Sequence, residues 1–222
     1  MLATAQAVRD RFGLGGGLYA AALDANGTRL SGPEQNPIMH LTEACLAASR
    51  VAEPTRFVRM LREIAEGVAG HFLDAGTQCI AELPLGTADN RIEPGHQFEW
   101  YSLLHSAPQI YDGLDLPRAV PRGCDWARSA GVAPDTAGVC AALDMRGAVR
   151  DATQRIWAQT EYARYLALSG DEPALQAQLR QFQARFLHAR GWREVLSGHG
   201  DLLRADMPST TPYHLATAYA AL

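Results

Sequence analysis

The feature of the sequence that most constrains the fold is a recurring pair of helical segments. Four consecutive units each contain a segment that is apolar on nearly every side, and in the first three it is followed by a second, outer helical segment, whose apolar residues form a single stripe over 54–72 and 173–186. A helix that is apolar all round is buried among other helices, whereas an amphipathic helix keeps one face in water. The all-round apolar segments carry polar residues at comparable places, roughly 50 to 65 residues apart: His40, His96, Glu161 and His214. A period of this size predicts stacked helix pairs, with buried inner helices wrapped by outer ones.

The expected elements follow this plan along the chain. Helices are expected over residues 2–12, 36–51, 54–72, 94–110 and 116–129, then around 157–161, from 173 to 186 and from 213 to 222. Turn signals predict short hairpins near Asn26-Gly27, at 144–147 and at 198–200, and a short strand is expected over 79–83. The fold class is therefore all-α with short β-hairpins between helix pairs. The alternative is an ordinary helical bundle in which four hairpins resemble one another by coincidence.

Length, composition and charge narrow the class of protein. The chain has 222 residues, of which 47% are hydrophobic, so it can bury a substantial core, and we expect a single domain over 1–222. A net charge of −4 without a basic run argues against nucleic acid or an anionic membrane as a partner. The first residues lack the long apolar core of a signal peptide, and no segment approaches a membrane span. We therefore expect a cytoplasmic protein, with secretion as the alternative.

Neither the cysteines nor the recurring polar residues form a recognisable metal-binding motif. Cys45, Cys79, Cys124 and Cys140 show no Cys-x-x-Cys spacing, so neither a zinc clip nor a redox motif is indicated. A metal site built from the recurring His and Glu residues is an alternative, but nothing in the sequence fixes a ligand geometry. We expect no metal and no cofactor.

The placement of the polar residues suggests a kind of chemistry. They fall at or near the starts of the inner helices, where unpaired N–H groups and the positive ends of the helix dipoles also lie. His96 and Glu99 are three residues apart and share one face of the first turn of their helix. Imidazoles and carboxylates gathered at helix N-termini suit a reaction that passes through an oxyanion, such as proton abstraction beside a carbonyl group.

Four motifs carry a resemblance to a known family. The chain resembles the N-acylglucosamine 2-epimerase family, and within it the branch of aldose–ketose (mannose) isomerases. The matching segments run almost end to end: Asn36-Pro37-Ile38-Met39-His40-Leu41-Thr42-Glu43, Glu93-Pro94-Gly95-His96-Gln97-Phe98-Glu99-Trp100, Trp157-Ala158-Gln159-Thr160-Glu161 and Met207-Pro208-Ser209-Thr210-Thr211-Pro212-Tyr213-His214. Ala158 stands where the family usually has Pro. The resemblance implies an (α/α)6 toroid and a cofactor-free conversion of a sugar through ring opening and a cis-enediol.

The resemblance also implies roles for individual residues. His96 and His214 would be the acid/base pair that moves the proton on C2 of the sugar, and Glu99 would orient His96 or raise its basicity. His40 would assist ring opening or contact a hydroxyl group, and Glu161 would contact the substrate. For each of these residues the alternative is an ordinary hydrogen-bonded side chain in the scaffold.

Three further residues are expected in substrate binding, and each has a scaffold role as its alternative. Trp100 and Trp157 could stack on a sugar face, although a buried Trp usually belongs to the core. Asn36 completes this set, and a scaffold role is its alternative. The expected partner is thus a small-molecule sugar. The sequence alone reveals neither which sugar it is nor whether it is phosphorylated.

The chain departs from the family in length. It holds only about four of the six helix pairs of the toroid, so it would be the C-terminal part of an (α/α)6 barrel. Two inner-helix flanks, near residues 38–51 and 208–222, would then lack neighbours, and we expect self-association through them. The favoured function is interconversion of a free aldose and its ketose, as of mannose and fructose. The alternatives are 2-epimerisation and a truncated sugar-binding or interaction module without activity, while the His-centred motifs argue against a glycoside hydrolase, which uses paired carboxylates.

Overall fold

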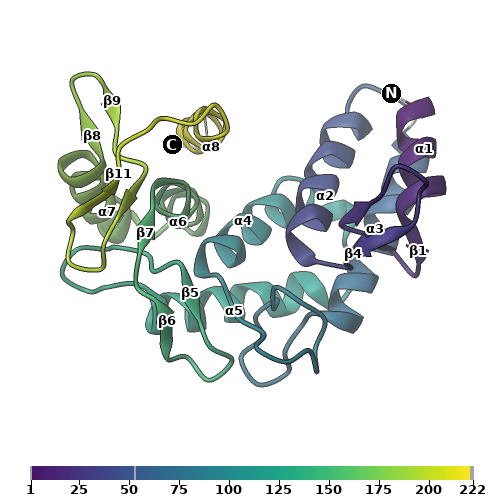
Figure 1. Ribbon diagram of the computed structural model, residues 1–222, viewed down its shortest axis with the longest axis horizontal. Helices are drawn as coiled ribbons and strands as arrows, with labels where there is room; N and C mark the ends of the chain where they lie inside the picture. The colour runs from purple at the N-terminus through teal and green to yellow at the C-terminus, as the bar shows by residue number, and fades with distance from the viewer. Residues whose placement is uncertain (1, 53, 221–222) are drawn as a thin grey trace. The chain divides into compact units, whose positions relative to one another are not determined.

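The computed structural model describes residues 2–52 and 54–220 (Figure 1). Its contacts divide the chain into two compact units. The first runs over Met1–Arg91 and Leu103–Gly123, and the second over Ile92–Ser102 and Cys124–Leu222. The boundary falls inside α4 (Pro94–His105) and α5 (Leu116–Gly131), so each unit contains part of both helices. The single domain expected over 1–222 stays a prediction.

The first unit is a helix pair preceded by a helix and two small hairpins. Its elements in chain order are α1 (Leu2–Phe12), β1 (Gly13–Gly15), β2 (Leu18–Tyr19), β3 (Ala22–Leu23), β4 (Arg29–Ser31), α2 (Gln35–Ser49), α3 (Pro54–His71) and the 3-10 helix η1 (Pro108–Ile110), followed by the first part of α5. The strand pairs β1–β2 and β3–β4 are antiparallel. Helices α2 and α3 pack against each other, and Ile38, Phe57 and Ile64 are buried in this unit (Figure 1).

The second unit repeats the pattern. After the first part of α4 and the second part of α5, it contains β5 (Ala142–Leu143), β6 (Val149–Asp151), β7 (Gln154–Arg155), α6 (Ile156–Ser169), α7 (Glu172–Phe186), β8 (Leu187–His188), β9 (Gly191–Trp192), β10 (Val195–Leu196), β11 (Leu202–Arg204) and α8 (Thr211–Tyr219). Strand β10 lies between β7 and β11 in a small antiparallel sheet. Helix α6 packs against both α7 and α8.

The difference between inner and outer helices is visible in their burial. Every residue from 156 to 163 of α6 is buried, so this helix has no wet face in its first two turns. Helix α3 buries Phe57, Leu61, Ile64 and Val68 on one stripe and carries charged residues on the other face. The predicted alternation of all-round buried and amphipathic helices is confirmed, and the fold is mainly helical as expected.

The predicted hairpins are confirmed at three comparable turns. Asn26-Gly27 joins β3 to β4, residues 144–147 join β5 to β6, and 198–200 join β10 to β11. The first two of these turns each contain an aspartate, Asp24 and Asp144. Its Oδ1 accepts hydrogen bonds from two backbone N–H groups at 2.8–2.9 Å. Such a turn needs a residue at positive φ, which Gly27 and Gly147 supply at 84° and 96°.

Some predicted boundaries were wrong. The strand expected over 79–83 is not formed, because only Ile80 makes an isolated bridge there, to Leu73. The helix expected to run to Ile110 ends at His105, and Pro108 begins a separate 3-10 helix. A residue that precedes proline is disfavoured in the helical region, which explains the break. Helix α8 is described to Tyr219, and the last two predicted positions lie outside the described residues.

The starts of α2, α4 and α6 are held by the chain that follows each helix pair. A backbone N–H at or just before the first turn donates to a carbonyl oxygen in the segment that leads to the next inner helix. The pairs are Gln35 to Glu82 at 3.1 Å, Ile92 to Leu143 at 3.0 Å and Ile156 to Glu194 at 3.1 Å. These bonds satisfy donors that a helix start leaves unpaired, and they place the residues of the first turn. Among the described helices, none is long and apolar enough to cross a membrane.

Candidate active site

The second unit brings two of the predicted site histidines onto one aromatic ring. The imidazole of His96, in the first turn of α4, stacks on Trp157 of α6 with ring centroids 4.9 Å apart and planes at 27°. The imidazole of His214, in α8, lies 5.5 Å from the same indole at 34°. Both histidines predicted to exchange a proton with the substrate thus contact Trp157. The indole is largely buried and is therefore held in place. We call this ring, which both imidazoles contact, the shared platform.

His214 is held by a buried carboxylate. Its Nδ1 lies 2.9 Å from Oε1 of Glu161, a residue with no exposed surface. An ionised carboxylate only accepts hydrogen bonds, so Nδ1 carries the hydrogen and Nε2 is the nitrogen suited to take up or return a proton. The other oxygen of Glu161 lies 3.5 Å from Nη1 of Arg164, which compensates the buried negative charge. We expected Glu161 to contact substrate, and this geometry also allows it to act through His214.

A second group of carboxylates lies near the two histidines. Oε2 of Glu93 is 3.6 Å from Nδ1 of His96, within ion-pair range. Glu99 was expected to orient His96, and the structure groups its carboxylate with Glu161 and His214, with one ligand atom of each residue within 4.8 Å of the others. By distance alone these three residues could accept a cation. Because Arg164 already supplies positive charge to Glu161, the set is equally consistent with a proton-transfer site.

Gln159, in the same motif, belongs to the scaffold. Its Oε1 accepts the backbone N–H of Val139 at 2.9 Å, and its Nε2 donates to the carbonyl of Val139 at 3.1 Å. The carbonyl of Gln159 in turn accepts Nε2 of Gln178 from α7 at 2.9 Å. These contacts fix the rotation of α6 and hence the direction of Trp157 and Glu161.

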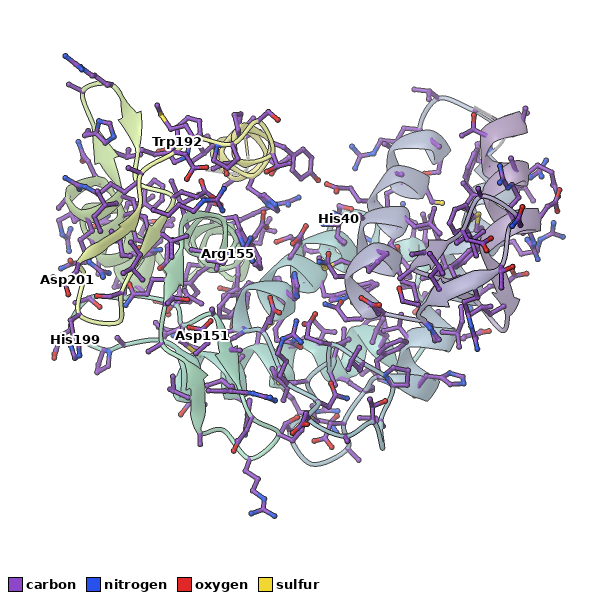
Figure 2. The ribbon with its side chains drawn as sticks, viewed as in Figure 1. His40, Asp151, Arg155, Trp192, His199 and Asp201 are labelled. Carbon is purple, nitrogen blue, oxygen red and sulfur yellow. The ribbon has the colours of Figure 1, made fainter. Side chains whose placement is uncertain are left out.

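Sequence reasoning missed a buried residue that supports His214. Glu194 is 3% exposed, and its Oε2 accepts hydrogen bonds from Nε1 of Trp192 and from the hydroxyl of Thr211, both at 2.9 Å. Thr211 is the first residue of α8, so this carboxylate anchors the turn that carries His214. Figure 2 labels Trp192 beside this region. The sequence signal was the recurrence of Glu at a comparable place, since Glu82 precedes the inner helix of the second unit as Glu194 precedes that of the fourth.

A second residue that sequence reasoning missed lies directly on the shared platform. The guanidinium of Arg155, labelled in Figure 2, lies over the ring of Trp157 with its central carbon 5.4 Å from the ring centroid. Arg155 is the residue immediately before α6, and its side chain is exposed. The three groups around the indole are therefore two imidazoles and one cation.

Two other predicted residues lie in the first unit. Nδ1 of His40 is 3.6 Å from Oε2 of Glu43, one turn further along α2, and the imidazole is about half exposed. Asn36 is exposed in the first turn of the same helix. Their assignment to substrate binding stays a prediction.

Trp100 was expected either to stack on a sugar face or to belong to the core. Its side chain is 0% exposed, which favours the core. Its assignment to substrate binding stays a prediction.

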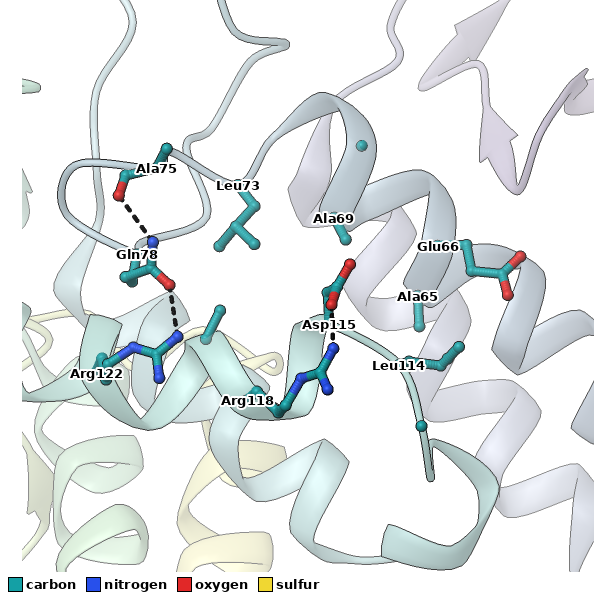
Figure 3. A pocket seen from close by; sticks show the side chains of 13 residues that line it. Ala65, Glu66, Ala69, Leu73, Ala75, Gln78, Leu114, Asp115, Arg118 and Arg122 are labelled. Carbon is teal, nitrogen blue, oxygen red and sulfur yellow. Dashed lines mark hydrogen bonds and ion pairs between the residues drawn. The ribbon is translucent and has the colours of Figure 1, made fainter.

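A separate hollow on the outer helices of the first unit has no connection with these residues (Figure 3). It is lined by small residues of α3 and by the start of α5, and its guanidinium groups are already engaged. Arg122 donates to Oε1 of Gln78 at 2.9 Å, and Arg118 pairs with Asp115. We assign no function to it.

Comparison with known proteins identifies the class to which this fold and site belong. The sequence pattern of the N-acylglucosamine 2-epimerase (GlcNAc 2-epimerase) family matches residues 16–218. The chain therefore belongs to this family of sugar isomerases and epimerases. Among curated proteins, it is similar to the mannose-6-phosphate isomerase of Rhizobium meliloti (strain 1021), at 30% identity over 209 residues. That match covers 82% of this chain and 53% of the relative, so the chain spans about half the relative's length.

Solved structures agree on the fold. A D-mannose isomerase superposes with a TM-score of 0.78 at 17% identity, covering 99% of this chain and 64% of that protein. The cellobiose 2-epimerase of Bacillus thermoamylovorans B4167 superposes with a TM-score of 0.75 at 17% identity, covering 90% of this chain and 55% of that protein. The expected toroid family is confirmed over the part of its length that this chain spans.

Proposed function

We propose that this chain is an aldose–ketose isomerase for a mannose-type sugar, free mannose and fructose being the pair expected from the sequence. The observation that carries the proposal is the contact of His96 and His214 with the same indole of Trp157. Two imidazoles at one platform are suited to giving and taking protons near neutral pH, because the unperturbed pKa of imidazole is about 6.5. Membership in a family of sugar isomerases and epimerases supports the same chemistry.

The proposed reaction moves one proton between neighbouring carbons of the open-chain sugar. One imidazole removes the proton from C2 while O1 of the aldehyde gains a proton, which gives the cis-enediol. The enediol then loses the proton on O2 and gains one on C1, so that the carbonyl group ends at C2. Glu161 would hold His214 with Nε2 toward the reacting carbons, since Nδ1 is committed to the carboxylate.

The first alternative is 2-epimerisation. It shares the enediol, but the proton returns to the opposite face of C2, so the product is an epimeric aldose. The name of the family and the structural likeness to a cellobiose 2-epimerase motivate this alternative. Chromatography of the products separates the two, because only the isomerase yields a ketose.

The second alternative is a sugar-binding or interaction module without turnover. It is motivated by the fraction of the relatives that the chain spans, 53% of the curated protein and 64% of the D-mannose isomerase. Binding of mannose without conversion to any product would favour this alternative.

The test replaces each imidazole. His96→Ala and His214→Ala should each reduce conversion of mannose to fructose at least roughly 10²-fold, the cost of losing a positioned acid or base. The helical circular dichroism spectrum should be retained. The double variant should lose less than the product of the two single losses if the residues act as a unit.

His199→Ala is the matched control, because His199 is exposed in the turn between β10 and β11 (Figure 2). It should turn over at the parent rate. Near-parent activity in His96→Ala or His214→Ala would remove that residue from the mechanism.

A further inference from the structure

The inference concerns Arg155 and rests on the proposed function. Its guanidinium lies over Trp157, the ring that both His96 and His214 contact. An arginine held on an aromatic face keeps its full charge, because the attraction comes from the ring quadrupole and not from a counter-ion. The indole thus holds a cation at the ring that both imidazoles contact, without neutralising it.

Three other arginines of the second unit do have a carboxylate partner. Arg128 pairs with Asp171 at 2.8 Å, Arg164 with Glu161 at 3.5 Å, and Arg204 with Asp206 at 2.6 Å. In the part of the chain that the structure describes, Arg155 has no carboxylate partner and its side chain is exposed. A fixed, exposed and uncompensated guanidinium is an anion receptor, and its fork of N–H donors matches a phosphate group in particular.

The position of Arg155 strengthens this charge. It is the N-cap residue of α6, with φ −91° and ψ 138°, and the 14-residue helix presents the positive end of its dipole there. Its backbone is also fixed, because it pairs with Val195 of β10 and its carbonyl accepts Nε2 of Gln159 at 3.2 Å. The stem of the side chain therefore starts from a rigid point beside the platform.

We propose that Arg155 binds the phosphate group of a phosphorylated aldose, so that the preferred substrate is a sugar phosphate rather than the free sugar. In a hexose 6-phosphate, C2 and the phosphate-bearing carbon are separated by four bonds. In the proposed complex the imidazoles would address the reacting carbons while the guanidinium holds the phosphate end. Arg155 is then a specificity-determining residue and takes no part in the proton transfer.

The test measures binding, so that it does not depend on turnover. Titration calorimetry of the 222-residue chain with mannose 6-phosphate and with mannose gives the ratio of the two affinities. The parent chain should prefer the phosphorylated sugar. Arg155→Gln should reduce that ratio by roughly ten- to a hundredfold, the range expected for losing a hydrogen bond to a charged group. Arg155→Lys keeps the charge but not the fork of N–H donors, so its affinity ratio should lie between that of the parent chain and that of Arg155→Gln.

Arg180→Gln is the matched control, because Arg180 is an exposed arginine on α7 and its loss changes the net charge equally. It should leave the ratio unchanged. Inorganic phosphate should compete with mannose 6-phosphate in the parent chain and much less in Arg155→Gln.

Three results would overturn the proposal: equal affinity of the parent chain for both sugars, equal weakening of both sugars in Arg155→Gln, or an equal effect of Arg180→Gln. The proposed isomerase activity fails separately. If mannose 6-phosphate binds through Arg155 but neither sugar is converted, the phosphate site stands and the isomerase does not. If mannose is converted without any preference for the phosphate, the isomerase stands and the phosphate site does not.

Discussion

Gly95 allows α4 and α6 to approach closely at the platform, and replacing it is a sensitive test of the site. A methyl group built on Gly95 would lie 2.7 Å from Cζ3 of Trp157 and 2.8 Å from Cβ of Ala158, where ordinary contacts are 3.4–4 Å. The indole cannot retreat freely, because it also contacts His96 and His214. Overpacking of this kind costs about 1–3 kcal/mol. The gain in helix propensity from Gly to Ala offsets at most about 1 kcal/mol of it.

We therefore expect Gly95→Ala to lower the free energy of unfolding by about 1–2 kcal/mol and to reduce turnover, because the stack of His96 on Trp157 must shift. Urea unfolding followed by circular dichroism measures the first effect, and the sugar assay measures the second. Gly70→Ala is the control: Gly70 is exposed on α3, and a methyl there meets no atom within 4 Å. That variant should gain up to about 1 kcal/mol. A Gly95→Ala protein as stable as Gly70→Ala would refute the close packing of α4 on Trp157.

Three other predictions concern stability, thiol reactivity and assembly. Asp171 caps α7 and accepts Nη1 of Arg128 at 2.8 Å, and this hydrogen bond holds the pKa of the carboxyl below its usual value of 3.8. Asp171→Ala should thus cost about 0.5–2 kcal/mol at pH 7, and urea unfolding should show that the cost shrinks as the pH falls below that value and the parent carboxyl is protonated. Burial raises the pKa of three thiols to about 11 or 12, so an aromatic disulfide reagent at pH 8 should react with them only after unfolding: Cys45, Cys79 and Cys140. Light scattering should show self-association through the flanks near α2 and α8, together with weak turnover, and a monomer of ordinary turnover would contradict this expectation.

The sequence predicted the elements whose signal is local. Helix periodicity and an opening proline, Pro54, Pro94 or Pro173, located the starts of α3, α4 and α7 within one residue. The strand expected over 79–83 failed because a strand requires one continuous partner. Here Ala81 donates to Phe72, while Glu82 donates to Arg91, so neighbouring residues pair with different segments and no ladder forms.

The site was predictable in part for the same reason. His96 and His214 stood out because they recur at comparable places in the repeat, and the structure places both on Trp157. The contact of Arg155 with that ring and the anchoring of α8 by Glu194 left no local pattern. Both contacts arise from tertiary packing between distant segments, and the spacing of residues along the sequence does not predict such packing.

The hydrogen bonds near the inner-helix starts couple each of these helices to the hairpin region that follows it. Ile92 and Leu143 exchange both of their backbone hydrogen bonds, and Ile156 donates to Glu194, so opening of a hairpin region would release the amide at or just before the start of the preceding inner helix. Native-state hydrogen exchange should therefore show each such amide exchanging together with the following repeat rather than with its own helix. In such a chain the last repeat governs how well Trp157 is held, although most of its residues never touch that ring.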